Sequence, residues 1–319
     1  MSYASIEDPE DNNAIPFCTM KMFPETTIHC VEWAKALFET QFTLNAQNFN
    51  KLKESKLQSV EFNNMSERKG IKKAIKQAER MPSDFDGCIA MARNKFQKLY
   101  HNDSLQLLHV YPLDFTDPSG RPFWSLPKRP PKDMKFDPDD IIHRNFIAAF
   151  ACLKAQMYGI KIPFEAPRSE AAKKEMARIA SEVKVKDFVP DDTKAEEIKK
   201  QQETEETEEI TKLNNEGDEN EEELPMMEPV LLKKKSSISP DMLEAVFAKT
   251  VQDDKVPLFS VEEFEKDNDD NFHIDFIHAA GNARAICYGL GEMDWITVKL
   301  KAGRIVPALA TTTAAVAGL

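Results

Sequence analysis

The amino-acid sequence predicts a mainly α-helical protein with long loops. Apolar residues recur every three or four positions in several segments, which is the spacing of one buried helix face. Side chains that can cap a helix stand in front of several of these segments. Few segments alternate apolar and polar residues in the manner of a half-buried strand. A chain of 319 residues is long enough for one large or two ordinary domains.

The first half of the chain contains three or four predicted helices. The apolar face of the first consists of Cys30, Trp33, Ala34, Leu37 and Phe38. Residues 45–80 are rich in lysine and in helix formers, so we expect one or two exposed helices there. Ser83 is the predicted N-cap of the next helix, with Asp86 three residues later as in a capping box. Its apolar face contains Phe85, Cys88, Ala92, Phe96 and Leu99.

A proline-rich loop separates these helices from the next one. Residues 111–138 contain too many prolines for regular structure, and we expect Phe123 and Trp124 to pin the loop onto the core. The helix that follows is capped by Asp139 or Asp140 and ends at Gly159. Its apolar face contains Ile142, Phe146, Ala149, Phe150, Leu153 and Met157.

Three more helices complete the predicted set. Two of them cover residues 169–183 and about 240–249. The last is long, and Asp269, Asp270 or Asn271 can cap it. Its apolar face contains Ile274, Ile277, Gly281, Ala285 and Tyr288.

Composition excludes several classes of protein. The five cysteines are irregularly spaced, without a Cys-x-x-Cys pair, and the six histidines show no metal-ligand spacing, so neither a disulfide framework nor a metal site is predicted. No apolar run approaches the ~20 residues that span a bilayer, and the N-terminus lacks a signal pattern. We therefore expect no membrane association and a reducing environment, in the cytoplasm or the nucleus.

The negative charge of the chain is concentrated in one tract. Residues 191–223 contain 15 acidic residues and 4 lysines, a net charge of −11, out of −12 for the whole chain. The tract has few apolar residues, so we expect residues 191–235 to form a disordered insertion, acting either as a solvated spacer or as a receptor for basic partners. The remainder has no basic excess, which argues against binding of nucleic acid.

Cys18 is the strongest candidate for a chemical role. It lies between Pro16 and Pro24, which favour a loop, and a helical pattern follows soon after. With Lys21 nearby, this is a position where the thiolate form of a cysteine is favoured. A pKa lowered from about 8.5 to about 7 makes roughly half of such thiols nucleophilic at neutral pH. The alternative is that Cys18 is a small buried apolar residue.

Five segments carry a family resemblance. Residues 15–24, Ile-Pro-Phe-Cys-Thr-Met-Lys-Met-Phe-Pro, with 28–34 shortly after them, resemble the region around the catalytic cysteine of ubiquitin-activating enzymes. The other four segments match the same family in the same order. They are 105–109, 122–130, 264–277 and 302–314. The chain departs from the family pattern at Met22, where asparagine is usual, and at Asn268 and Asp270.

The resemblance implies a division into domains. Residues 1–17 would arrive from an adenylation domain, 18–295 would form a multi-helix catalytic-cysteine domain, and 296–319 would begin the return to an α/β adenylation domain. No glycine-rich phosphate loop of either common type occurs in the sequence. We therefore expect the chain to be the second catalytic-cysteine half-domain with a truncated piece of adenylation domain, either a fragment or a truncated gene model, and inactive alone.

The resemblance also implies the chemistry. Cys18 would accept ubiquitin from its acyl-adenylate as a thioester and pass it to the cysteine of a conjugating enzyme. Thr19, Lys21, Asp267 and Asp269 occupy positions that match the family and would support the site. The intact enzyme would use ATP and Mg²⁺, neither of which we expect to be bound by this fragment.

Two alternatives to ubiquitin activation stay open. The segment 28–35 has some similarity to the SUMO-activating subunit, although 123–130 favours the ubiquitin type, so the chain could serve another ubiquitin-like modifier. The other alternative is a non-catalytic module that only docks conjugating enzymes. In every case the expected partners are a modifier of the ubiquitin type and its conjugating enzymes.

Overall fold

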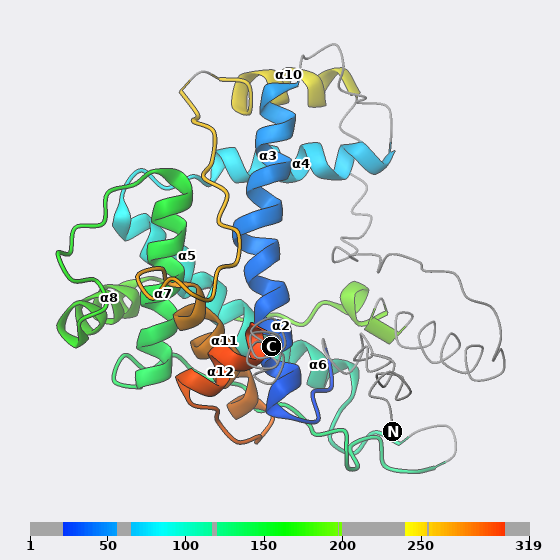
Figure 1. Ribbon diagram of the computed structural model, residues 1–319. Coiled ribbons are helices and arrows are strands. Elements are labelled where there is room, and N and C mark those ends of the chain that lie inside the picture. The colour runs from blue at the N-terminus through cyan, green and yellow to red at the C-terminus, as the bar shows by residue number, and fades with distance from the viewer. Residues whose placement is uncertain are drawn as a thin grey trace, which may run out of the picture.

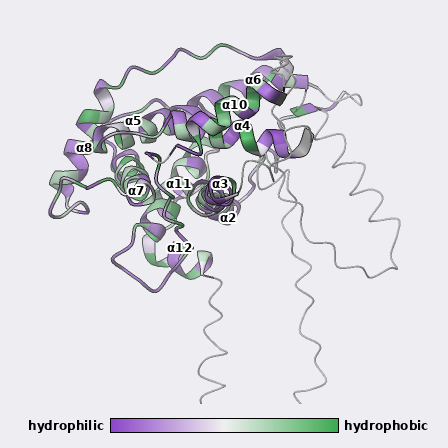
Figure 2. Cartoon of the chain, turned by 90° about the horizontal axis from the view of Figure 1, so that it is seen from above, coloured by the Kyte–Doolittle hydropathy of each residue, from purple (hydrophilic) through white to green (hydrophobic). Residues whose placement is uncertain are grey.

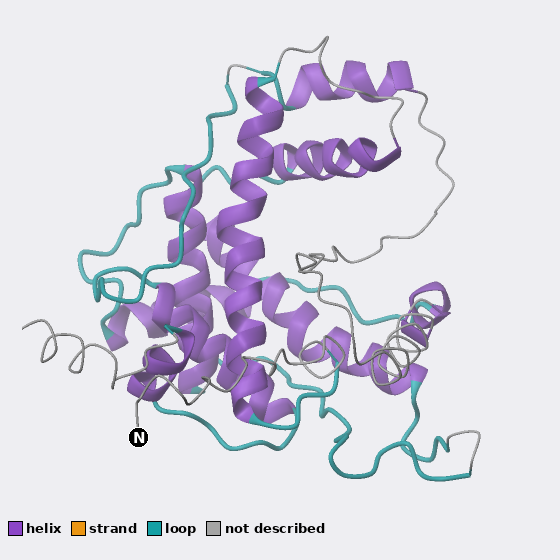
Figure 3. Cartoon of the chain, turned by 45° about the vertical axis from the view of Figure 1, so that its right-hand side comes forward, coloured by secondary structure: helices purple, strands orange, loops and turns teal. Residues whose placement is uncertain are grey.

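The computed structural model describes residues 22–55, 65–116, 120–196, 198–199, 240–253 and 255–303. Within these ranges the regular elements are helices, and the β-pairing consists of an isolated bridge between Thr116 and Pro122 (Figure 3). The predicted mainly α-helical class is confirmed.

The helices follow the predicted order closely. In chain order they are α2 (Thr27–Phe38), the π-helical turn η2 (Glu39–Leu44), α3 (Asn45–Glu54), α4 (Met65–Glu79), α5 (Phe85–Phe96), the π-helical turn η4 (Gln97–Asn102), α6 (Asp103–Val110), α7 (Ile141–Tyr158), α8 (Glu170–Glu182), α10 (Pro240–Thr250), α11 (His273–Cys287) and α12 (Trp295–Ala302).

The elements α2, η2 and α3 form one continuous rod that reaches from one end of the described structure to the other (Figure 1). At 1.5 Å per residue the rod is about 42 Å long. It belongs to two apolar clusters, since Phe38 and Phe42 pack in the main core and Ala46 and Phe49 pack in a second cluster. The rod therefore joins two lobes.

The main core is built around α7, which is buried on nearly every side and packs against α5, α8 and α11. Its ends are as predicted. Asp140 accepts hydrogen bonds from the backbone N–H groups of Ile142 (2.8 Å) and His143 (3.0 Å), and Gly159 ends the helix with a φ of 68°.

Two predicted helix caps are wrong. At α5 the cap is Asp84, whose carboxylate accepts from the N–H of Gly87 at 2.8 Å, while the Ser83 hydroxyl donates to Asp84 instead. At α11 the N-cap position is Phe272, and of the three predicted capping residues only Asn271 binds the first turn, by accepting from the N–H of His273.

Helices α2 and α11 pack closely and run antiparallel. The ring of Phe38 at the end of α2 lies 4.7 Å from that of His273 at the start of α11, and Thr27 at the start of α2 donates to the carbonyl of Gly291 just after α11. The backbones come close at Gly281, where a Cβ would be in contact with the Cys30 carbonyl oxygen at 3.4 Å.

The second lobe consists of α3, α4 and α10. Residues 45–54 and 65–79 are helical as predicted, but one face of α4 is not exposed, because Ile71, Ala74 and Ile75 are buried against α10. In the view from above, α4 and α10 lie side by side and each mixes hydrophilic and hydrophobic residues (Figure 2). Phe259 closes the cluster by stacking on Phe49 at 3.9 Å.

Two boundaries differ from the expectation. The predicted disordered insertion begins in an ordered segment, since residues 192–196 are helical and Ala195 packs in a third, small apolar cluster. The rest of the insertion from residue 200 to 235 lies outside the described residues. The expected domain boundary after residue 295 falls inside α12, which packs against α2 and α11 through Val298 and Ala302.

Candidate functional site

Three of the predicted site residues, Cys18, Thr19 and Lys21, lie outside the described residues. The described chain begins immediately after them with Met22 and Phe23, both of which are buried. The contacts of these two residues therefore define where the chain that carries Cys18 joins the fold.

Phe23 is held in a group of aromatic rings, which we call the Phe23 anchor. Its ring lies edge-on to those of Phe123 (5.6 Å), Trp124 (5.9 Å) and Tyr111 (6.3 Å). Tyr111 stacks on Phe123 at 4.2 Å, and the Lys128 ammonium lies 5.0 Å from the Phe123 ring. Each aromatic pair contributes roughly 0.5–1.5 kcal/mol beyond its buried area. The predicted pinning of the loop at Phe123 and Trp124 thus occurs, but onto Phe23 rather than onto the main core.

Tyr288 binds the backbone of Met22, the residue that precedes Phe23. Its buried hydroxyl donates to the carbonyl oxygen of Met22 at 2.7 Å. Burial raises the pKa of Tyr288 to about 12, against the opposing charge of Arg284, so the hydroxyl stays a donor at neutral pH. The Arg284 guanidinium lies between the rings of Trp33 (4.4 Å) and Tyr288 (5.3 Å). The backbone four residues after Cys18 is therefore fixed to the C-terminal end of α11.

His29 lies in the first turn of α2, and its side chain has a partner there. Its Nδ1 accepts a hydrogen bond from the backbone N–H of Glu25 at 3.2 Å. The imidazole thus satisfies one of the donors that precede the helix. This is a structural role at the start of α2.

Asp267 and Asp269 are not brought together with Met22. They precede α11, whose 15 residues correspond to about 22 Å, whereas Tyr288 and Met22 lie at its other end. Asp267 pairs with Lys266 at 2.9 Å, and Asp269 pairs with Lys299 of α12 at 2.6 Å. Asp269 thus ties the segment before α11 to α12, whereas the pair of Asp267 lies within that segment.

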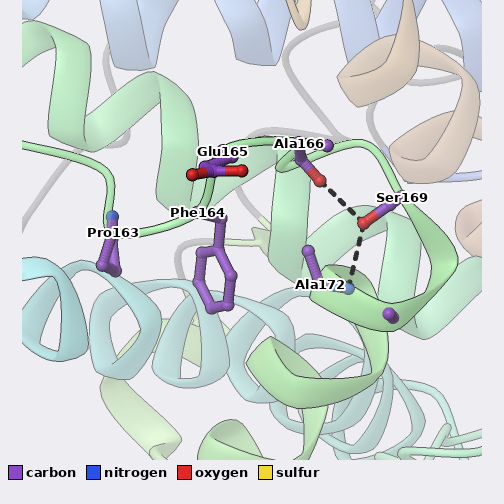
Figure 4. Close-up of a pocket in the computed structure, with 7 residues that line it drawn as sticks. Pro163, Phe164, Glu165, Ala166, Ser169 and Ala172 are labelled. Atoms are coloured by element: carbon purple, nitrogen blue, oxygen red, sulfur yellow. Dashed lines mark hydrogen bonds between the residues drawn. The ribbon is translucent and has the colours of Figure 1, made fainter.

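One pocket of the described structure can be compared with the needs of a nucleotide. An open pocket of about 390 Å³ lies before and along the first turn of α8 (Figure 4). Its lining contains Glu165 but no lysine or arginine, and the Ser169 hydroxyl is already bonded to Ala166 and Ala172. In the described ranges no three His, Cys, Asp or Glu side chains gather as metal ligands, and no helix there is long and apolar enough to cross a bilayer.

Comparison with known proteins settles the family. Residues 24–299 match the family of the ubiquitin-activating enzyme SCCH domain. The chain belongs to the ubiquitin-activating enzyme family. The match begins just before α2 and ends within α12, so this SCCH domain comprises both lobes and the long rod that joins them.

The relatives are much longer than this chain. It is 35% identical to ubiquitin-like modifier-activating enzyme 6 of Homo sapiens, covering 100% of this chain and 28% of the relative. Identity to ubiquitin-like modifier-activating enzyme 1 is 34% for Dictyostelium discoideum (99% and 29% covered) and 32% for Homo sapiens (100% and 27% covered). The SCCH-domain chain thus spans less than a third of their length.

The sequence did not predict the role of two residues that fix the backbone next to the candidate cysteine. Tyr288 was predicted only as part of a buried helix face, and Phe23 only as part of the family motif. The signal that points to Phe23 is its place directly before Pro24, five residues after the candidate cysteine. No local signal identifies Tyr288, because its partner Met22 lies 266 positions away.

Proposed function

We propose that Cys18 accepts an activated ubiquitin as a thioester and passes it to the cysteine of a conjugating enzyme. The single observation that carries this proposal is the state of the other four cysteines. Burial raises the pKa of Cys30 to about 11 and the pKa values of Cys88, Cys152 and Cys287 to about 12, so these thiols stay protonated. The fifth cysteine, Cys18, is the one that lies in the family motif.

The proposed reaction is an acyl transfer. The Cys18 thiolate attacks the carbonyl carbon of the modifier's C-terminal acyl-adenylate, a C–S bond forms, and the C–O bond to AMP breaks. AMP leaves with the electron pair of that bond as an anion. Lys21 would favour the thiolate, and Thr19 would hydrogen-bond the thioester. ATP and Mg²⁺ would act in the adenylation part of the intact enzyme, which we expect in the cytoplasm and nucleus.

A thiol-dependence experiment tests the proposal. In the intact protein, where this chain is joined to an adenylation domain, ATP and ubiquitin are expected to give an adduct that thiol reductants cleave. The Cys18→Ala variant is expected to form the adenylate but no adduct. The matched control is Cys152→Ala, a buried cysteine of α7, which keeps the adduct. An adduct that persists in Cys18→Ala would disprove the catalytic role.

A different modifier remains the alternative substrate. The relatives include both ubiquitin-like modifier-activating enzyme 1 and ubiquitin-like modifier-activating enzyme 6. Running the same assay with ubiquitin and with another ubiquitin-like modifier separates these substrates. A chain that binds conjugating enzymes but forms no adduct with any modifier would instead be a docking module.

Tyr288→Phe is expected to slow thioester formation by about 3- to 10-fold. The variant loses the hydrogen bond to Met22, and such a bond is worth about 0.5–1.5 kcal/mol. Adenylate formation, followed by exchange of pyrophosphate, is expected to stay unchanged, because Tyr288 acts only through the backbone that carries Cys18. Tyr158→Phe is the control, since Tyr158 is similarly buried but packs in the second cluster. Equal slowing by both variants would contradict a positioning role for Tyr288.

A further inference from the structure

Helix α4 has two opposite faces. At 100° per residue, one face consists of the apolar residues Ile71, Ala74, Ile75 and Ala78, which pack in the second cluster. The opposite face is cationic over three turns. It consists of Lys69, Lys72, Lys73, Lys76 and, just past the last turn, Arg80. We call this second surface the cationic face of α4.

On the cationic face, Lys73 has an interaction of its own, whereas three other lysines are unpaired with the described residues. In the part of the chain that the structure describes, Lys69, Lys72 and Lys76 form no ion pair, and Lys69, Lys76 and Arg80 are exposed. Helix α8 is different, because Arg178 there pairs with Glu175 and Glu182 of the same helix. The charge of Lys69, Lys72 and Lys76 is thus available to a negative segment.

Such a segment is attached to the same lobe. Residues 203–223 contain 11 acidic residues and one lysine. Sixteen residues separate this segment from Pro240, where α10 begins, and α10 packs against α4 (Figure 1). At no more than about 3.6 Å per residue, sixteen residues can reach up to roughly 58 Å, which is well beyond the roughly 22 Å length of α4. Tethering at this distance gives an effective concentration on the order of millimolar.

We propose that the acidic segment 203–223 binds the cationic face of α4 within the same chain. The remainder of the chain outside residues 191–223 has a net charge of only −1, so it provides no comparable excess of positive charge. Each exposed ion pair is weak and is screened by salt, but several pairs act together on one tethered segment. The contact is therefore electrostatic, reversible and sensitive to ionic strength, and it is independent of the role proposed for Cys18.

Amide NMR of residues 203–223 in the full chain tests this contact. At about 0.02 M salt the signals of wild type are expected to differ from those of a variant carrying Lys69→Glu, Lys72→Glu and Lys76→Glu. Raising the salt to about 0.5 M, where the Debye length falls to a few ångströms, is expected to move the wild-type signals onto those of the variant. The variant itself should hardly respond.

A control with the same change in net charge separates contact from bulk charge. It carries Lys174→Glu, Lys184→Glu and Lys301→Glu, three exposed lysines outside α4, and is expected to match wild type. If the glutamate variant unfolds by circular dichroism, Lys→Gln at the same three positions of α4 replaces it. Wild-type signals that are identical to those of the α4 variant, or a control that shifts as much, would overturn the proposal and leave the face free for an acidic partner.

Discussion

Replacement of Phe276 by alanine is expected to lower the free energy of unfolding by about 3–5 kcal/mol, the range for large aromatic truncations in a core. Phe276 is fully buried in the first turn of α11. Its ring lies 5.3 Å from that of Phe42, 5.8 Å from Phe146, 6.1 Å from Phe150 and 6.2 Å from Phe38. The cavity thus opens where α2, η2, α7 and α11 meet, and none of these helices can close it without moving the others.

Urea denaturation followed by far-ultraviolet circular dichroism measures this loss. Phe276→Leu retains most of the apolar volume and is expected to cost much less than Phe276→Ala. Phe188→Ala is the surface control, since Phe188 is only partly buried and lies in a loop. A Phe276→Ala variant with the midpoint of Phe188→Ala would show that the main core does not depend on this ring.

The comparison of α7 with α5 shows what a sequence can predict about a helix. At α7 the capping aspartate, the apolar face and the terminal glycine are all local signals, and all were read correctly. At α5 two adjacent residues, Ser83 and Asp84, are both good caps, and sequence alone favoured the serine. The folded chain uses the carboxylate because it accepts from Gly87, and the serine hydroxyl is left to support it.

Residues far apart in the sequence determine contacts that local sequence patterns do not predict. Asp269 was expected at the cap of α11, but it pairs with Lys299, which lies 30 residues further along the chain. An exposed helix was expected where α4 forms, yet one face of α4 is buried against α10, which lies more than 160 residues away, and the two helices belong to a separate lobe. The candidate cysteine follows from a motif, whereas the Tyr288 hydroxyl that fixes the neighbouring backbone has no such signal.

Long-range packing also buries Lys154. The free energy of unfolding is expected to depend on pH for this reason. This lysine of α7 is buried, and its ammonium lies 4.8 Å from the Phe42 ring and donates to the carbonyl of Gln41 at 2.8 Å. Burial, with a smaller effect from Lys95, lowers the pKa of Lys154 to about 7, against an opposing effect from Cys88. Lys154, which donates a hydrogen bond to η2, therefore loses its charge near neutral pH.

We expect the stability advantage of Lys154→Met over wild type to shrink by on the order of 3–4 kcal/mol between about pH 7 and about pH 10. In this window the unfolded chain keeps the lysine proton, since its pKa is about 10.4, while the folded protein has released it. The wild-type free energy of unfolding therefore rises by about 1.4 kcal/mol per pH unit relative to the methionine variant. Below about pH 7 both states hold the proton and the difference is constant.

Urea unfolding of both proteins at several pH values measures this difference directly, because contributions from the buried cysteines and tyrosines are shared and cancel. Lys301→Met, at an exposed position of α12, is expected to give a difference from wild type that does not change with pH. A flat difference for Lys154→Met as well would mean that the folded protein keeps Lys154 charged. In that case the contacts of the ammonium with the aromatic rings and with the Gln41 carbonyl would fully offset its loss of hydration, and the pKa of Lys154 would not be lowered by burial.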